Sequence, residues 1–376
     1  MKLFVLSSGY PDPGGSTLCG FVHARCLEYV RLGAEVRVIV YYGDPREYVI
    51  DGIPVRHAPM DEIFRVISQD QPDACAVHFP IREFCEAHDR HRPGIPFGLW
   101  FHGMETLSWM RRLFNFSDAF GFFKYAWHNS IQLRVLRTFL LKNGGNRNVR
   151  LVYVSEWMHR IAEADLGIRI PDYRTIPNPI DCEHFAHHPK SPEQRFDVLL
   201  LRSFDSRKYA NDISVDAIRM LSRTAGKDFA RFRFRIFGKG RHFKELTSKL
   251  VGFPNVSCEE RYFPREEIPA VHRGSGVFLC PTRQDAQGVS MCEAMASGLV
   301  PVTSLNTAIP EFVTHEKDGL LARSAAEVAD ALLRLAREPE FFMKLSAGAA
   351  GRMRSQCEGR SVAKQEMALL FPDAAS

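Results

Sequence analysis

The chain has 376 residues, of which 45% are hydrophobic and 25% are charged, and this composition excludes a fibrous or disordered protein. The length predicts two domains of about 150–200 residues each. The formal net charge of +5 permits an anionic ligand or an anionic membrane surface. A protein that binds nucleic acid along a groove is usually more basic, so we expect no nucleic-acid partner.

The nine cysteines are scattered and include no C-x-x-C pair. This pattern predicts reduced thiols in a cytoplasmic protein and no zinc site. The N-terminal run KLFVLSS is too short for a signal peptide, and no apolar run reaches the roughly 18 residues of a membrane span.

Apolar runs alternate with helical patterns along the first half of the chain. A helix is predicted over 21–33, between the first two of several predicted strands: 2–8, 34–42, 73–79, 96–103, 150–155 and 173–179. This alternation predicts a parallel α/β sheet. Ligands bind at the carboxyl ends of such strands, where we expect His78, His102, Ser155 and Asn178.

The polar, proline-containing stretch 186–196 predicts a linker, after which the alternation restarts. Strands are predicted over 196–203, 232–240, 276–282 and 299–304. We therefore expect an N-terminal domain over 1–188 and a C-terminal domain over 189–355. A helix at about 356–376 is expected to pack back on the first domain.

The stretch DAQGVSMCEAMASG (285–298) predicts a turn at Gly288 and then a helix. The start of a helix offers unpaired N–H groups and a positive dipole end, which suit an anion. Asp285 and Glu293 flank this turn, and carboxylates accept hydrogen bonds from sugar hydroxyls. A capped helix with two solvated acids explains the pair equally well.

Basic residues follow the predicted strand 196–203. Arg202 lies at its end and Lys208 six residues later, and clustered cations of this kind bind a diphosphate. A solvated basic loop is the simpler interpretation when these residues are taken alone.

Three weaker signals lie at other predicted strand ends. The glycines of PGGS (13–16) allow close backbone approach to a ligand, although the loop matches neither G-x-G-x-x-G nor the P-loop pattern. His102 ends an apolar strand. Gly238 lies in a βα turn, and Tyr262 or Phe263 is placed to flank a nucleotide base.

Residues 111–150 hold eight Lys or Arg, one acid and eight aromatic residues. This mixture suits an anionic membrane interface and, less well, single-stranded nucleic acid. A helix that merely buries its aromatic side chains is the competing interpretation.

Taken together, these features resemble the retaining GT-B glycosyltransferases, specifically glycosyltransferase family 4, over nearly the whole chain. The most specific match is the family's E-x7-E element and the E-A-M-A-[SC]-G-x-P-V run, which resemble Asp285-x7-Glu293 and EAMASGLVPVTS (293–304). The runs IPNPIDCEHF (176–185) and TAIPEFVTHEKDGLLA (307–322) resemble two further family motifs. The chain departs from the family at Asp285, where the family has glutamate, and at Pro179, Thr307 and Ala308, where it has glycines.

The resemblance implies two Rossmann-like domains facing across a cleft. The N-terminal domain would bind the acceptor, and the C-terminal domain a nucleotide-diphosphate sugar. It also implies transfer with retention and without a metal or other cofactor. The absence of a D-x-D pair from the sequence agrees with this last expectation.

The resemblance also assigns roles to individual residues. Arg202 and Lys208 would stabilise the leaving diphosphate. Glu293 would accept from the ribose hydroxyls and Asp285 from a sugar hydroxyl, and His102 would contact the donor sugar near the reacting carbon. The remaining donor contacts would come from backbone or ring groups of Gly14, Gly15, Gly238, Tyr262, Gly288, Val289 and Ser290.

The sequence therefore predicts a metal-independent hexosyltransferase that uses a UDP- or GDP-sugar. Its acceptor would be a glycan or a lipid-linked molecule, as in bacterial surface polysaccharide or lipopolysaccharide synthesis. We expect it in the cytoplasm, at the inner face of a membrane if 111–150 binds lipid. A nucleotide-sugar epimerase or isomerase of the same architecture is the alternative enzyme, and a non-catalytic membrane-docked scaffold is the alternative of another class.

Overall fold

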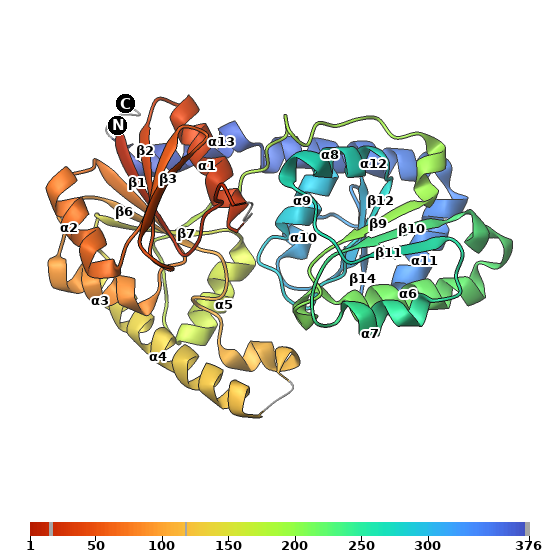
Figure 1. Ribbon diagram of the computed structural model, residues 1–376, viewed down its shortest axis with the longest axis horizontal. Coiled ribbons are helices and arrows are strands. Elements are labelled where there is room, and N and C mark those ends of the chain that lie inside the picture. The colour runs from red at the N-terminus through yellow and green to blue at the C-terminus, as the bar shows by residue number, and fades with distance from the viewer. Residues whose placement is uncertain (15–17, 117–118, 373–376) are drawn as a thin grey trace. The chain divides into compact units, whose positions relative to one another are not determined.

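The computed structural model describes residues 1–14, 18–116 and 119–372. They form two compact units: in Figure 1, unit 1 is coloured red to yellow-green with a blue C-terminal helix, and unit 2 green to blue. Unit 1 comprises residues 1–179 and the segment from Gly359 onward, and unit 2 comprises residues 180–358. Unit 2 begins earlier than the predicted boundary at residue 188, because the N–H of Ile180 already donates to the carbonyl of Cys357 at 2.7 Å.

Unit 1 is built on an eight-stranded sheet of order β3-β4-β2-β1-β5-β6-β7-β8, in which only the β3–β4 pair is antiparallel. Its strands are β1 (Lys2–Ser7), β2 (Glu35–Val40), β3 (Arg46–Ile50), β4 (Ile53–His57), β5 (Ala74–His78), β6 (Phe97–Phe101), β7 (Val149–Tyr153) and β8 (Arg174–Thr175). The central strands β1, β5 and β6 are buried on both faces, which explains their unbroken apolar sequences.

Helices cover both faces of this sheet (Figure 1). They are α1 (Gly20–Arg31), α2 (Met60–Asp70), α3 (Arg82–His91), η1 (Trp109–Asn115), α4 (Ala119–Asn143), α5 (Glu156–Leu166) and α13 (Gly359–Leu370). The C-terminal helix α13 packs against α1, and it contacts β5 and β6. Its buried Glu366 accepts hydrogen bonds from Arg25, Tyr29 and Trp100.

Unit 2 has a six-stranded, fully parallel sheet of order β11-β10-β9-β12-β13-β14. Its strands are β9 (Asp197–Leu201), β10 (Arg233–Phe237), β11 (Val256–Glu259), β12 (Val277–Leu279), β13 (Val300–Ser304) and β14 (Leu320–Ala322). The carboxyl ends of β9, β10, β11 and β12 therefore lie at one edge, and the predicted donor residues of unit 2 follow these four strands.

The helices of unit 2 are α6 (Asn211–Thr224), α7 (Phe243–Thr247), α8 (Ile268–Arg273), α9 (Val289–Ala296), α10 (Ile309–Phe312), α11 (Ala325–Arg337) and α12 (Pro339–Gln356). Short 3-10 turns η2 (Pro192–Phe196), η3 (Arg207–Tyr209), η4 (Gly226–Arg231), η5 (Ser248–Leu250) and η6 (Arg265–Glu267) complete it. The linker predicted over 186–196 is wrong, because this stretch is part of unit 2. Phe196 lies in its hydrophobic core, and Arg195 donates to the carbonyl of Ala336 at 2.8 Å.

Within the described residues, none of the helices has the length and apolar character needed to cross a membrane.

Candidate functional site

Arg202 is a buried cation of unit 2, at the end of β9, with 7% of its surface exposed. Its Nη1 donates to the carbonyl of Cys280 at 2.9 Å, and its Nη2 lies 3.4 Å from the Oδ2 of Asp285. The β9 end is thereby tied to the loop that follows β12. The structure thus brings together the predicted Arg202 and Asp285.

Asp285 also shapes the turn that starts α9. Its Oδ1 accepts from the N–H of Gly288 at 2.8 Å and from the N–H of Gln287 at 3.3 Å. Gly288 has a positive φ of 79°, a conformation that glycine adopts at little cost. The carboxylate therefore holds the turn before α9 with one oxygen and Arg202 with the other, and it leaves the first N–H groups of the helix uncapped.

The first backbone N–H groups of α9 have no partner within the helix. Cys292 donates the first intrahelical bond, to the carbonyl of Gly288, so Val289, Ser290 and Met291 precede any intrahelical acceptor. Both Val289 and Ser290 are partly exposed. Together with the helix dipole, these groups form a site suited to an anionic ligand group.

Lys208 lies in η3, which is held against the same loop. Its carbonyl accepts from the N–H of Arg283 at 2.7 Å and from the hydroxyl of Thr282 at 2.9 Å. The Nζ of Lys208 and the guanidinium carbon of Arg202 lie 4.8 and 4.9 Å from the centre of the Tyr209 ring. One aromatic ring therefore positions both predicted diphosphate cations.

Glu293 lies in α9 and is partly buried. Desolvation raises the pKa of its carboxyl group to about 7, with the Arg265 guanidinium opposing this rise and the Asp181 carboxylate adding to it. Arg265 donates to Asp181 at 3.0 Å, so Glu293, Arg265 and Asp181 form a cluster of three titratable groups. Sequence reasoning missed Asp181 and Arg265, although Asp181 lies within the IPNPID run that resembles a family motif.

Close packing explains why residue 238 is a glycine. A Cβ at this position would lie 1.9 Å from the carbonyl oxygen of Arg202, and its φ is +153°. Its role in this structure is thus to let β10 approach the β9 end closely. Tyr262 is 48% exposed, and its hydroxyl donates to the carbonyl of Lys239 at 3.1 Å, which holds the ring beside the loop after β10.

His102 lies in unit 1, directly after β6. Its Nε2 is 3.0 Å from the Nδ1 of His78 at the end of β5, so one proton is shared between these ring nitrogens. Burial holds the pKa of both histidines well below the usual range, and the nearby Arg25 guanidinium adds to this effect. His102 is therefore a neutral imidazole, able to accept or donate a hydrogen bond.

Glu105 is a buried carboxylate that sequence reasoning missed. Its Oε1 accepts from the N–H of His102 and its Oε2 from the N–H of Gly103 at 3.1 Å. Burial raises its pKa to about 7, against these stabilising N–H contacts. The sequence did offer a signal for a buried acid, because Glu105 is the one acid in the apolar run WFHGMETL (100–107). Glu105 fixes the backbone of the loop that carries His102.

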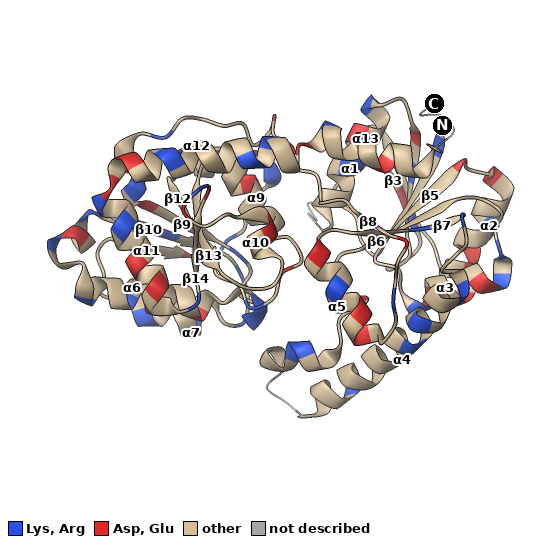
Figure 2. Ribbon diagram, turned by 180° about the vertical axis from the view of Figure 1, so that it is seen from behind, with Lys and Arg blue, Asp and Glu red and all other residues tan. Residues whose placement is uncertain are grey.

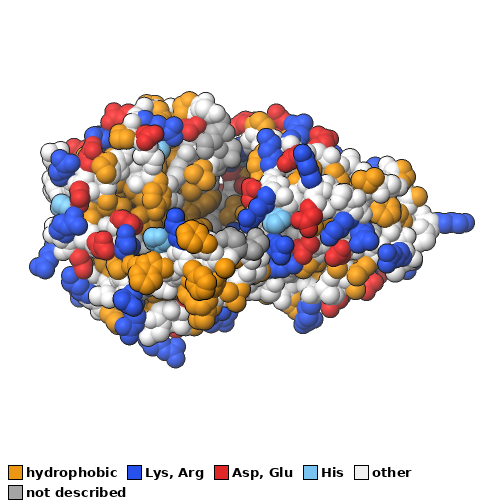
Figure 3. Space-filling view, turned by 60° about the horizontal axis from the view of Figure 1, so that its bottom comes forward, with side chains coloured by type: hydrophobic (Ala, Val, Ile, Leu, Met, Phe, Trp, Pro, Cys, Tyr) orange, Lys and Arg blue, Asp and Glu red, His pale blue; other side chains and the backbone are white. Residues whose placement is uncertain are grey.

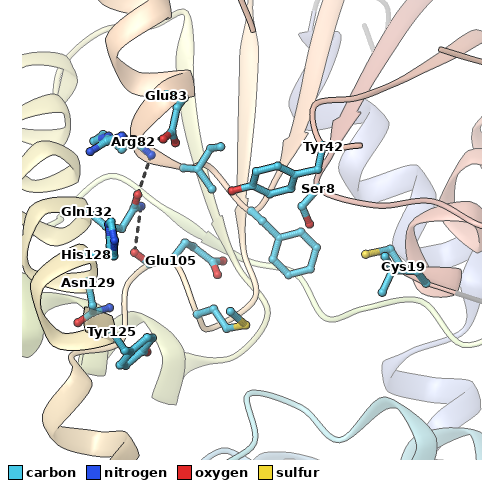
Figure 4. Close-up of a pocket in the computed structure, with 14 residues that line it drawn as sticks. Ser8, Cys19, Tyr42, Arg82, Glu83, Glu105, Tyr125, His128, Asn129 and Gln132 are labelled. Carbon is cyan, nitrogen blue, oxygen red and sulfur yellow. Dashed lines mark hydrogen bonds and ion pairs between the residues drawn. The ribbon is translucent and has the colours of Figure 1, made fainter. Parts of the chain in front are cut away.

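A cavity of about 550 Å³ opens in unit 1 beside this loop (Figure 4). Its lining is Ser8, Leu18, Cys19, Tyr42, Phe79, Ile81, Arg82, Glu83, Met104, Glu105, Tyr125, His128, Asn129 and Gln132. Gln132 accepts from the N–H of Arg82 at 2.6 Å and donates to the carbonyl of Glu105, which fixes one wall. Apolar walls with a few placed polar groups are typical of small-molecule sites.

The glycine loop of unit 1 is described only in part. Gly14 is exposed, and a Cβ there would lie 3.0 Å from the Oδ1 of Asp12. The predicted donor contact at Gly15 lies outside the described residues. Gly14 and His102 belong to unit 1, whereas Arg202, Lys208, Asp285 and Glu293 belong to unit 2. In the described part of the chain, His, Cys, Asp and Glu form no group of three that would hold a metal ion.

Solved structures define the class of fold. A sucrose-phosphate synthase from Thermosynechococcus elongatus superimposes with a TM-score of 0.76 at 15% identity, over 100% of both chains. Anabaena HepE in complex with UDP superimposes with a TM-score of 0.71 at 15% identity, over 99% of this chain and 100% of that one. The chain therefore has the GT-B fold.

Sequence comparison finds known relatives for part of unit 2. Residues 195–338 match the family model described as glycosyl transferases group 1. The amylovoran biosynthesis glycosyltransferase AmsK of Erwinia amylovora is 30% identical over 135 residues, which are 33% of this chain and 32% of AmsK. The match thus spans about a third of the length of this curated relative. Residues 195–338 are thus similar to the group 1 glycosyltransferases.

Proposed function

We propose that this protein is a retaining glycosyltransferase that moves a sugar from a UDP- or GDP-sugar to a glycan or lipid-linked acceptor. The observation that carries the proposal is the meeting of Arg202, Lys208 and the start of α9 around one loop of unit 2. The group 1 match covers this loop, and the name of AmsK suggests surface polysaccharide synthesis as the setting. HepE, solved with UDP, has the same fold.

The leaving nucleoside diphosphate gains negative charge as the bond to the sugar breaks. Arg202 and Lys208 would stabilise it by charge-assisted hydrogen bonds, and the N–H groups of Val289 and Ser290 would add the dipole of α9. This chemistry needs no metal ion, so we propose a metal-independent transfer. A phosphate oxygen of the leaving group would take the proton of the acceptor hydroxyl on the same face of the sugar, which retains its configuration.

The hydroxyl groups of the donor would be bound by two carboxylates, Asp285 in the loop and Glu293 in α9. Asp285 would exchange its contact with Arg202 for a sugar hydroxyl as the diphosphate takes over the guanidinium. Glu293, ionised above a pH of about 7, would accept from the ribose. The neutral His102 would contact the donor sugar from unit 1 through a ring nitrogen.

The cavity beside Glu105 is our candidate for the acceptor site. Its lining is largely apolar, with Arg82, Glu83, Glu105 and His128 among the charged or titratable groups at its wall. An acceptor with an apolar part and a few hydroxyls fits this lining. All nine cysteines are free thiols, which fits a reducing cytoplasm, where we propose that the enzyme works.

A panel of UDP- and GDP-sugars tests the proposal by thermal shift. A donor present at 100 times its dissociation constant raises the unfolding free energy by about 2.7 kcal/mol, which is readily measured as a shift in Tm. Analysis of the products without added acceptor separates the alternatives. Slow release of free sugar and nucleoside diphosphate supports the transferase, whereas an isomerised nucleotide sugar would replace it with the epimerase. A protein that binds no donor would refute both.

A further inference from the structure

The aromatic residues of 111–150 divide into two sets in the structure. Phe116 packs on Phe122 and Tyr125 at ring distances of 5.6 and 5.0 Å, and Trp109 packs on Phe122 at 5.4 Å. These rings pack η1 against α4. For these residues, the interpretation that the stretch buries its aromatic side chains is sufficient. The second set faces solvent, although the ring of Phe123 also lies 5.5 Å from the ring of Phe122.

The second set forms one continuous face of α4. Phe120, Phe123 and Trp127 are 81%, 68% and 69% exposed. Their spacing of three and four residues places them on the same side of successive helical turns. Met110 and Leu113 of η1 are also 61% and 55% exposed. We call these five residues the aromatic surface, and Figure 3 shows hydrophobic side chains gathered on the face of unit 1 that carries them.

The α4 part of the aromatic surface lies in a segment whose only charged residues are basic. No aspartate or glutamate occurs from residue 119 to 155. Lys124, Arg134 and Arg137 are exposed on α4, and none of them forms an ion pair with another described residue. Figure 2 shows basic and no acidic positions along α4. The occupant of this surface must therefore tolerate exposed rings and supply negative charge.

From these observations we infer that the aromatic surface docks on an anionic phospholipid bilayer. Phe and Trp side chains enter the interface between headgroups and acyl chains, while Lys and Arg contact the phosphates around them. A second copy of the chain fits less well, because an isologous pairing would bring Lys124, Arg134 and Arg137 of both copies together. The same helix lines the cavity of unit 1 with Tyr125 and His128, so a docked membrane would lie close to the proposed acceptor site.

Vesicle flotation of the full-length chain tests this inference. The probe is vesicles of phosphatidylcholine with a quarter phosphatidylglycerol, compared with phosphatidylcholine alone. We expect the wild type to float with the anionic vesicles and much less with the neutral ones. The combined variant Phe120→Ser, Phe123→Ser, Trp127→Ser should lose about tenfold or more of its partitioning, because the apolar contribution is removed.

A matched control replaces exposed apolar residues of unit 2, Val251→Ser with Met220→Ser, which are 83% and 40% exposed in the wild type. This control should float like the wild type. A charge variant, Lys124→Glu with Arg137→Glu, should lose its preference for anionic vesicles. Circular dichroism and Tm verify that each variant is folded. Raised salt should weaken binding only in part, because ring insertion is not screened.

Three outcomes would overturn the inference. A wild type that does not float with anionic vesicles would refute it, and so would an aromatic variant that floats undiminished. Aromatic-dependent self-association in sedimentation velocity, without flotation, would assign the surface to a second copy. The donor site lies in unit 2, so Lys208→Ala should lower turnover roughly thirtyfold or more and leave flotation intact. Failure of the proposed function and failure of this inference are therefore distinguishable.

Discussion

The carboxylate of Asp285 binds Arg202 with one oxygen, at 3.4 Å, and the N–H of Gly288 with the other, at 2.8 Å. The cation proposed for the diphosphate and the turn before α9 are thus held by a single short side chain. A longer acid would not span the two partners in the same way, since the extra methylene moves the carboxylate away from the turn.

The substitution Asp285→Glu tests what this short side chain does. We expect the Gly288 contact to weaken and the ratio of kcat/KM between two donor sugars to change by about tenfold, because a change of about 1.4 kcal/mol in one hydroxyl contact suffices. The measurement is steady-state turnover with each donor, and Asp216→Glu on the exposed face of α6 is the control. Unchanged rate and unchanged preference would show that position 285 carries no selectivity.

Glu293 predicts a pH dependence of donor binding. Its pKa lies at about 7, so the carboxyl is neutral below that pH and accepts ribose hydroxyl bonds fully only above it. Donor affinity should therefore rise as the pH increases from about 6 to 8, and the rise should disappear in Glu293→Gln. Calorimetric titration with UDP and GDP at several pH values measures it. A wild-type affinity that falls over this range would contradict the proposed role.

The buried Glu105 predicts a pH dependence of stability in the opposite sense. Its pKa is raised from 4.5 to about 7 on folding, so its stabilising contribution is complete below 4.5 and is lost as the pH rises through 7. The wild type should lose up to about 3 kcal/mol of unfolding free energy relative to Glu105→Gln as the pH rises from 5 to 8. Urea unfolding at both pH values provides the comparison. A difference between the two proteins that does not change with pH would contradict this assignment.

Glu366 predicts that the C-terminal helix is essential to unit 1. Its carboxylate accepts from Arg25 at 2.8 Å, Tyr29 at 2.6 Å and Trp100 at 3.0 Å, all buried. Glu366→Ala leaves an uncompensated guanidinium in the core and should cost about 3–5 kcal/mol. Lys364→Ala, at an exposed position of the same helix, should cost almost nothing. Equal Tm values for the two variants would show that the buried contacts carry no net stability.

The alternation of apolar runs sufficed to predict most of the central strands, because parallel strands buried on both faces have unbroken hydrophobic sequences. It failed at the edges of the sheets. The hairpin of β3 and β4 was missed although Asp51-Gly52 is a strong turn signal, and both residues have positive φ. Its strands are short, and β3 is largely exposed, so their pattern resembles a loop.

The sequence predicted the part of the candidate site that follows neighbouring strands, but not the contacts from distant segments. Arg202, Asp285 and Gly288 are close in the structure because each follows a neighbouring strand of one sheet, which the strand prediction already implied. The surroundings of Glu293 depend on Asp181 and Arg265, which come from distant segments whose packing no local pattern reveals. The same holds for Gly238, whose glycine is required by the approach of the Arg202 carbonyl.

The most direct test of the proposed function is turnover of a UDP- or GDP-sugar by the wild type and by Lys208→Ala. The wild type should release nucleoside diphosphate from at least one donor. The variant should lose about 2–4 kcal/mol of transition-state stabilisation, roughly thirtyfold to a thousandfold in kcat/KM, with its Tm unchanged. Equal turnover by the two proteins, or none by the wild type with any donor, would contradict the account.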